Sequence, residues 1–521
     1  MVKGFRQIAS LTTISRVFGL IRDTAFSHFF GAGWLMTAWT MGFKIPNLAR
    51  RLFGEGAAAA SFIPVYTQQL HEDPQQAKKL ASTVVTVIFV LLAVIAIIGE
   101  LLIWGYYKFF DTNLGTQLGL TLSAVMLPYM IFICVVALLS GILQVHKHFA
   151  APAAAPIVLN IFIITSLLLS GWLLKIPPQT QVFWVATAVI LAGLAQIVIQ
   201  IPPLAKAGVS IRPAWQVRSE SFKKIIILMG PMILGLTVTQ INTLADDLIA
   251  LGLSNEQGYP LDYGAVSYLY YAQRLYQFPL GVLGISLATA IFPVMSAAAA
   301  KNDTDTLIAT ISKGIKAAVF VALPATAGLF LVGTILVSVI FEHGKFTPEN
   351  TAVTSRTLVF YALGLSGYFA QQVTMRAFYS IQNSKLPAIT ALIAVFVNVV
   401  LNLILIWPMG TAGLALSTAI CSYLQVIILV FMLKKQFGSI ILDGLGQTLT
   451  KTIIAAVIMW IAGAILMFLM RNLPNVRFFN IIRLAVVVPV AVSVYFIAAK
   501  AMKMPEISLI TGQKKSEKIA N

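Results

Sequence analysis

Apolar runs long enough to cross a bilayer recur along the whole chain, and this feature constrains the fold more than any other. Of the 521 residues, 59% are hydrophobic and only 10% are charged, whereas soluble domains carry roughly 25% charged residues. A run of about 20 apolar residues spans the hydrocarbon core of a membrane as a helix. The sequence therefore predicts an all-α integral membrane protein.

The hydropathy pattern predicts fourteen transmembrane helices. The second continues past Gly54 and Gly56 into 61–70, which we expect to form a kinked or interfacial extension. The predicted spans are 5–29, 34–56, 80–107, 118–145, 152–173, 181–203, 223–252, 264–295, 308–340, 353–380, 387–407, 411–433, 448–470 and 479–500.

Basic residues alternate between the loops on the two sides of the predicted bundle. With the N-terminus in the cytoplasm, the cytoplasmic loops hold most of the lysines and arginines, including five within 206–224, and the opposite loops hold few. This distribution follows the positive-inside rule, so both termini are predicted to be cytoplasmic. The net charge of +18 therefore needs no nucleic-acid partner.

The chain repeats weakly around a segment rich in charge, proline and glycine at 205–221. Ser61-Phe62-Ile63-Pro64-Val65 has a counterpart in Ala290-Ile291-Phe292-Pro293-Val294. We predict two six-helix lobes, 1–208 and 219–437, which start on the same side of the membrane. The remaining regions are a pair of additional helices, 438–502, and a basic cytoplasmic tail, 503–521. Parallel repeats of this kind are a transporter architecture.

Arginines inside apolar spans are the strongest indication of function. Arg16 and Arg22 lie in the first span, Arg50 and Arg51 in the second, and Arg274 in the eighth. An arginine at bilayer depth is costly and tends to face a bundle interior or a watery cavity. We interpret the set as a cationic cavity for an anionic substrate.

Nearby acids can neutralise only part of this charge. Asp23 shares a helical face with Arg16, and Arg22 points about 120° away from Arg16, so Asp23 can neutralise one of the two. Arg51 and Glu55 form an i,i+4 pair, which leaves Arg50 for another partner. The alternatives are a structural Arg–Asp network, arginines that snorkel to an interface, and, for Arg50 and Arg51, the positive-inside rule alone.

Arg274 has no acid within one helical turn along the sequence, and its neighbours are tyrosines and glutamines. Asp246 and Asp247 of the seventh span are candidate partners. The planar guanidinium fork of arginine suits phosphate oxygens. Arginines from both lobes directed at one site would suit a pyrophosphate.

Catalytic motifs are missing from the sequence. It contains no H-E-x-x-H, C-x-x-C or G-x-S-x-G motif, and Gly344-Lys345-Phe346-Thr347 lacks the earlier glycine of a P-loop. The sequence therefore predicts a transporter and not an enzyme. Without a P-loop for ATP hydrolysis, we expect an ion gradient or the membrane potential to drive transport.

Several motifs together resemble the MurJ-type (MviN) lipid II flippases of the multidrug/oligosaccharidyl-lipid/polysaccharide exporter superfamily. The resemblance covers essentially the whole chain. The motifs are Ser15-Arg16-Val17-Phe18-Gly19-Leu20-Ile21-Arg22-Asp23, Phe30-Gly31-Ala32-Gly33, Phe43-Lys44-Ile45-Pro46-Asn47-Leu48-Ala49-Arg50-Arg51, Met229-Gly230-Pro231, Tyr271-Ala272-Gln273-Arg274-Leu275, Phe278-Pro279-Leu280-Gly281-Val282 and His343-Gly344-Lys345-Phe346-Thr347.

The resemblance implies a cavity between two lobes that opens alternately to each side, and a groove for the lipid tail formed by the last two helices. Arg16, Arg22, Arg50 and Arg274 match the family's cavity arginines, which engage the pyrophosphate, and Asp23 matches a family acid. A sodium site found in some members falls on Asp246, Asn398, Asn402 and Thr418. Asn402 replaces a carboxylate there, so Asn398 and Asn402 could equally be hydrogen-bonding contacts between helices.

The predicted function is transfer of lipid II, the lipid-linked peptidoglycan precursor, across the bacterial cytoplasmic (inner) membrane. By resemblance the substrate is an undecaprenyl-pyrophosphate-linked disaccharide-peptide. We expect a monomer that works with the cell-wall synthesis machinery, with sodium or the membrane potential as driver and no other cofactor. The alternatives are a polysaccharide-lipid or drug exporter of the same superfamily, and a non-transporting scaffold or membrane-embedded transferase.

Overall fold

The regular elements of the chain are helices. The computed structural model describes residues 2–110 and 114–508; within the helices, the side chains of residues 2–9, 54–60, 114, 231, 234–239 and 439–440 lie outside this description. In the described ranges the only extended pairing is an isolated bridge between Ser254 and Leu261. The all-α prediction is therefore confirmed.

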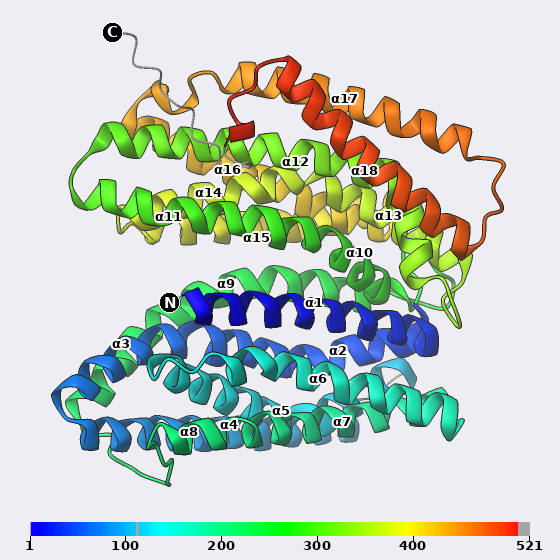
Figure 1. Cartoon of the computed structure of the whole chain (residues 1–521). Coiled ribbons are helices and arrows are strands. Elements are labelled where there is room, and N and C mark those ends of the chain that lie inside the picture. Colours follow the sequence, from blue (N-terminus) through cyan, green and yellow to red (C-terminus); the bar gives the residue numbers. More distant parts are fainter. Residues whose placement is uncertain (1, 111–113, 509–521) are drawn as a thin grey trace. The chain divides into compact units, whose positions relative to one another are not determined.

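The chain divides into two compact units, which are Met1–Asp247 with His343–Phe346, and Leu248–Glu342 with Thr347–Asn521. Figure 1 labels their helices. The first unit contains α1 (Val2–Phe30), α2 (Trp34–Ala49), η1 (Arg50–Gly56), α3 (Ala57–Glu72), α4 (Pro74–Phe109), α5 (Leu114–Val145), α6 (Ala150–Leu168), η2 (Leu169–Leu173), α7 (Pro178–Val198), α8 (Ile201–Lys206) and most of α9 (Glu220–Gly252).

The second unit contains the end of α9 and the elements that follow it. These are α10 (Ala265–Pro279), η3 (Leu280–Gly284), α11 (Ile285–Ala300), α12 (Thr304–Phe341), α13 (Pro348–Leu363), α14 (Leu365–Ser380), α15 (Lys385–Met409), α16 (Thr411–Phe437), η4 (Ser439–Leu442), α17 (Leu445–Leu469) and α18 (Arg477–Ala501). The lobes predicted from the sequence follow the repeat and begin the second lobe at 219, so they assign most of α9 differently.

Each of the fourteen predicted spans falls on one helix or on consecutive helices. Within the described residues, ten helices are long and apolar enough to cross a membrane. The number fourteen stays a prediction. Helix α1 is not among the ten, because Arg16, Arg22 and Asp23 interrupt its apolar sequence.

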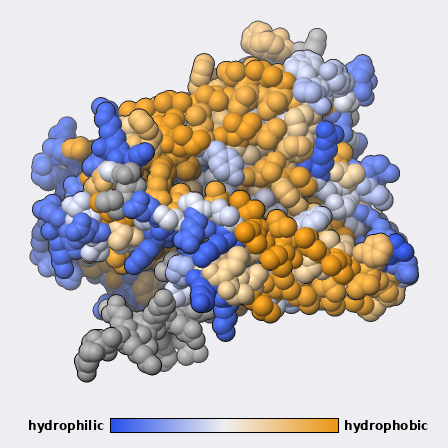
Figure 2. Space-filling view, turned by 90° about the horizontal axis from the view of Figure 1, so that it is seen from above, coloured by the Kyte–Doolittle hydropathy of each residue, from blue (hydrophilic) through white to orange (hydrophobic). Residues whose placement is uncertain are grey.

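Large apolar side chains cover broad parts of the surface, as Figure 2 shows in orange. Leu102, Leu173 and Phe396 are each about 70% exposed. Exposed apolar patches of this extent mark an interaction surface. On helices of this length and hydropathy the surface is the one that contacts lipid.

The helices of the two units pack in corresponding pairs. In the first unit α5 packs against α2, α4 and α7, and α6 packs against α7. In the second unit the pair α13 and α14 packs against α10, α11, α12 and α16, and α15 packs against α16. In both repeats, therefore, the fourth span packs against the second, third and sixth, and the fifth span packs against the sixth.

A π-helical segment interrupts the second span of each repeat. η1 begins at Arg50, eleven residues before Ser61, and η3 begins at Leu280, ten residues before Ala290. Such segments widen a helix by one residue per turn and recur at functional sites. Arg50 opens the first of them.

Helices α17 and α18 form an antiparallel pair in which each binds the end of the other. Arg483 of α18 donates to the carbonyl oxygens of Met470 and Leu473 at the end of α17, and Lys451 of α17 donates to Met502 O at the end of α18. Basic side chains at these positions satisfy carbonyls that a helix C-terminus leaves open. The lipid-tail groove assigned to this pair by resemblance stays a prediction.

A short segment between α12 and α13 is assigned to the first unit, although the helices on both sides of it belong to the second. In this segment, His343–Phe346, Lys345 N donates to His28 O at 2.9 Å. His343 Nε2 lies 3.1 Å from Thr24 O. The segment therefore lies against the C-terminal end of α1.

Candidate functional site

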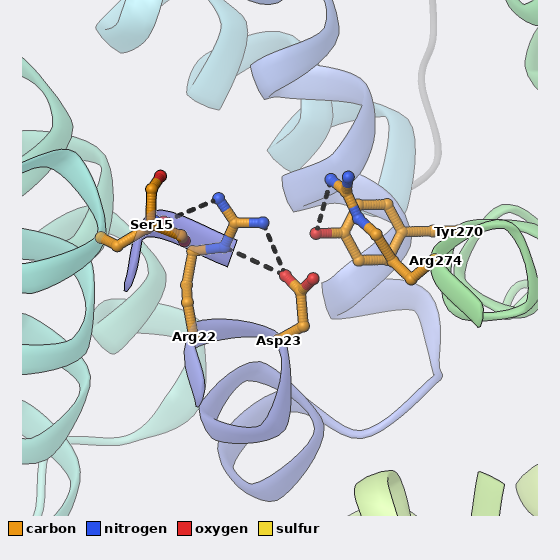
Figure 3. Close-up of polar contacts among 6 residues, drawn as sticks. Ser15, Arg22, Asp23, Tyr270 and Arg274 are labelled. Atoms are coloured by element: carbon orange, nitrogen blue, oxygen red, sulfur yellow. Dashed lines mark hydrogen bonds and ion pairs between the residues drawn. The ribbon is translucent and has the colours of Figure 1, made fainter. Parts of the chain in front are cut away.

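Arg22 is held in place by two acceptors. Its Nε and Nη2 atoms donate to Asp23 Oδ1 at 3.0 and 2.7 Å (Figure 3). Its Nη1 atom donates to Asn160 Oδ1 of α6 at 3.1 Å. Asn160 Nδ2 in turn donates to Ser15 O at 3.4 Å. The Arg22 and Asp23 side chains are only 14% and 5% exposed. A charge-assisted network of this kind fixes the guanidinium.

Asp23 pairs with its neighbour Arg22 and not with Arg16, which shares its helical face. Seven residues separate Arg16 from Asp23, a rise of about 10.5 Å, so the shared face does not bring the charges together. Arg16 is exposed. Among the described side chains it has no hydrogen-bond partner, so its charge is available to a ligand.

The junction of α2 and η1 supplies two more cations. Arg50 donates through Nε and Nη2 to Asn47 Oδ1 at 3.1 and 2.9 Å. Arg51 donates through Nη1 to Gln240 Oε1 of α9 at 2.8 Å. The side chain of Glu55, the predicted partner of Arg51, lies outside the described side chains, so that pairing stays a prediction.

Lys44 adds a cation that was not among the predicted site residues. Its Nζ atom forms an ion pair with Asp247 of α9 and lies 3.4 Å from Thr243 O. The Lys44 and Asp247 side chains are 21% and 6% exposed. The sequence offered Asp247 as a partner for Arg274, but its carboxylate has another partner in this pair. Asp246 is also buried, in the part of α9 that belongs to the first unit.

Arg274 is an exposed residue of α10 in the second unit. Its guanidinium lies over the ring of Tyr270, with its carbon 4.6 Å from the ring centroid, and Nη2 donates to Tyr270 Oη at 3.2 Å (Figure 3). The adjacent Gln273 donates to Tyr361 Oη at 3.1 Å. The tyrosine face orients Arg274 without neutralising its charge.

Three residues of the predicted sodium site lie together in a buried amide and hydroxyl network between α15 and α16. Asn398 Nδ2 lies 3.3 Å from both Ser417 Oγ and Thr418 Oγ1, and Asn402 Nδ2 donates to Asn398 Oδ1 at 3.0 Å. Ser417 Oγ also donates to Asn402 Oδ1. The amides therefore join the two helices. Within the described residues no group of three His, Cys, Asp or Glu side chains is placed to hold a metal.

Asn160, Lys44, Gln240 and Ser417 were not predicted as site residues. Asn160 carries a visible signal, because it is the only amide side chain in the predicted span 152–173. Its contact with Arg22 joins positions 138 residues apart. Sequence spacing gives no access to a contact of that kind.

Two helical units, lipid-facing apolar surfaces and fixed cations within the spans define a multi-pass membrane transporter. The family model described as lipid II flippase MurJ matches residues 26–486. A probable lipid II flippase MurJ from Vibrio cholerae serotype O1 is 32% identical over 472 residues, covering 88% of this chain and 86% of that protein. A lipid II flippase MurJ from Burkholderia cenocepacia is 30% identical over 441 residues, with 82% and 83% covered. The chain belongs to the lipid II flippase MurJ family.

Solved structures share the fold. A structure described as lipid II flippase MurJ in an inward closed conformation has a TM-score of 0.77 at 23% identity, covering 96% of this chain and 99% of that one. An inward-facing multidrug resistance MATE family transporter of the MOP superfamily has a TM-score of 0.65 at 14% identity, with 83% and 98% covered. The resemblance drawn from the sequence is therefore confirmed at the level of the family, and the exporter alternative shares only the fold.

Proposed function

We infer that this chain flips lipid II across the membrane, as a transporter and not an enzyme. Membership of the lipid II flippase family carries this conclusion, and the multi-pass helical structure agrees with it. We further propose that the membrane is the bacterial cytoplasmic one and that both termini are cytoplasmic. The excess of basic residues in alternate loops supports that orientation.

We propose that Arg16, Arg22, Arg50 and Arg274 bind the pyrophosphate of the substrate. Arg16 supports this most directly, because it is exposed and has no hydrogen-bond partner among the described side chains. An intramembrane charge is costly unless a partner or a ligand satisfies it. Arg22 is held rigid by Asp23 and Asn160, so it would meet an anion with little loss of side-chain freedom. Bidentate arginine contacts suit phosphate oxygens.

Alternating access is the proposed mechanism, because a fixed site must be exposed to each leaflet in turn. A driver is needed to bias the cycle, since binding alone only shifts populations. We propose the membrane potential, which supplies about 2.3 kcal/mol per unit charge at 100 mV. The hydrogen-bonded amides of Asn398 and Asn402 favour a structural role over a sodium site.

The protein is proposed to act as a monomer that passes lipid II to the cell-wall synthesis machinery. The measured mass of the purified protein in detergent tests the first part. Crosslinking in cells to enzymes that consume lipid II tests the second.

The decisive experiment is depletion of the native protein with rescue by variants, following lipid II at the outer leaflet. Arg16→Ala and Arg274→Ala should fail to restore exposure at wild-type protein levels. Arg376→Ala is the matched control, because Arg376 is another arginine in a span, is half-buried and already binds Thr289 Oγ1 at 2.8 Å. Wild-type exposure with both test variants would disprove the arginine site. Unchanged exposure after depletion of the protein itself would contradict the flippase function.

A further inference from the structure

Polar residues along α9 contact other helices of the first unit. Ser221 and Lys224 bond Gln69 and Gln68 of α3 at 2.5 and 3.2 Å. Further along, α9 meets Arg51 through Gln240 and Lys44 through Thr243 and Asp247. None of the closely packed helix pairs in the described chain includes α9.

Near the C-terminal end of α9, these contacts join two helix faces. Lys44 and Arg51 lie seven residues apart on α2 and η1, and Gln240 and Asp247 lie seven residues apart on α9. Residues seven apart share a helix face. One basic face therefore meets one polar face, and their only acid–base contact is Lys44 with Asp247 among the described residues.

Lys44 stands on the same segment as Arg50, one of the predicted pyrophosphate ligands. Its side chain is 21% exposed, whereas the Asp247 side chain is 6% exposed. The Lys44 side chain is therefore the more accessible member of the pair. Lysine binds phosphate as a point charge with three rotatable donors, so it can exchange one oxygen acceptor for another without a fixed geometry.

We propose that Lys44 is a further ligand of the substrate's pyrophosphate and that Asp247 occupies it as a counterion until the substrate arrives. This inference rests on the proposed function. A pyrophosphate brings two negative charges and more acceptor oxygens than one carboxylate, so it competes for the ammonium. Asp247 is thus an internal competitor of the substrate.

Asp247 lies at the boundary between the two units. It is the last residue of the first unit before the chain passes into the second at Leu248. Loss of the Lys44 contact removes an attachment of α9 at that point. Substrate binding is thereby linked to release of the helix segment that connects the two units.

The test is lipid II binding by the purified full-length protein in detergent, with substitutions that separate the two partners. Asp247→Asn keeps an acceptor for Lys44 but removes the competing charge, so it should tighten binding about three- to tenfold. Lys44→Gln should weaken binding at least tenfold. Arg376→Gln removes a half-buried cation elsewhere in a span and should leave the dissociation constant within twofold.

The critical result is that Asp247→Asn tightens lipid II binding whereas Lys44→Gln weakens it. An ion pair with only a structural role predicts that both variants lower thermal stability and that neither tightens binding, so an unchanged or weaker Asp247→Asn protein overturns the proposal. Should Asp247→Asn fail to fold, the double variant with Lys44→Gln retains a neutral hydrogen bond. Its binding should equal that of Lys44→Gln alone, and wild-type affinity would refute a ligand role for Lys44.

Arg16→Ala in the same assay separates this proposal from the proposed function. If Arg16→Ala weakens binding and Lys44→Gln does not, the arginine site stands and the counterion exchange is wrong. If Lys44→Gln weakens binding and Arg16→Ala does not, Lys44 is a ligand and the assignment of Arg16 fails.

Discussion

Replacing Gly344 with alanine should detach the His343–Phe346 segment from the end of α1. Gly344 has φ +63°, and an added Cβ would lie 2.3 Å from His28 O and 2.6 Å from His28 Nδ1. The left-handed backbone costs a residue with a Cβ about 1–2 kcal/mol. Loss of the Lys345–His28 hydrogen bond adds roughly 0.5–1.5 kcal/mol. The free energy of unfolding should therefore fall by about 2–3 kcal/mol in total.

Gly258→Ala supplies the matched control. Gly258 also has positive φ, +71°, but an added Cβ would meet nothing within 4 Å. The free energy of unfolding of Gly258→Ala should therefore fall only by the backbone cost, about 1–2 kcal/mol. Gly31→Ala approaches the same contact from the other side, since its Cβ would lie 2.6 Å from Lys345 O, and it should behave like Gly344→Ala.

Thermal unfolding in detergent at one fixed heating rate measures the difference. At roughly 2–4 °C per kcal/mol for a unit of 150–250 residues, Gly344→Ala should unfold about 4–12 °C below the wild type, and Gly258→Ala about 2–8 °C below it. A protease-accessibility assay at the α12–α13 connection should show faster cleavage only in the Gly31 and Gly344 variants. Equal losses for Gly344→Ala and Gly258→Ala, without faster cleavage, would refute the contact-based reasoning.

Three further substitutions test other contacts. Asn160→Leu removes an acceptor of Arg22 and should lower stability by about 1–3 kcal/mol and slow lipid II exposure; Asn160→Asp, which keeps an acceptor, should be milder in both assays. Arg483→Met leaves two carbonyls at the end of α17 without their donor, so hydrogen exchange should rise at that helix end and stay unchanged in the first unit. Burial, followed by the charges of His148 and Lys78, lowers the pKa of His146 below 6.5. The unfolded state then binds the proton more readily, so stability should fall as the pH drops through 6.5 toward the lowered value, and melting curves of His146→Gln should lack that component.

The helices were predictable because their signal is local. Each predicted span needs only a run of apolar residues, and each falls on helical segments of the structure. The division of α9 between the units was not predictable in this way. It depends on contacts between residues far apart in the sequence.

The site was predictable in its residues and less so in its contacts. Asp23 could neutralise only one arginine of its helix, and the structure selects Arg22, whose side chain also reaches Asn160. Helical periodicity predicts that Arg16 and Asp23 share a face, but it ignores the rise that separates them. Arg51 bonds Gln240 of another helix, a contact that no spacing rule along α2 contains.

The network around Arg22 also affects how the protein is made. Helix α1 leaves the ribosome before α6, yet it carries charges that cost about 2.5–3.5 kcal/mol each at the centre of an inserting helix. The amide that binds Arg22 follows 138 residues later, a delay of roughly 7–28 s at 5–20 residues per second. During that interval Arg22 has Asp23 of its own helix as a partner but lacks its acceptor in α6. The hydrogen-bonded network around Arg22 is therefore completed only after α6 has been synthesised.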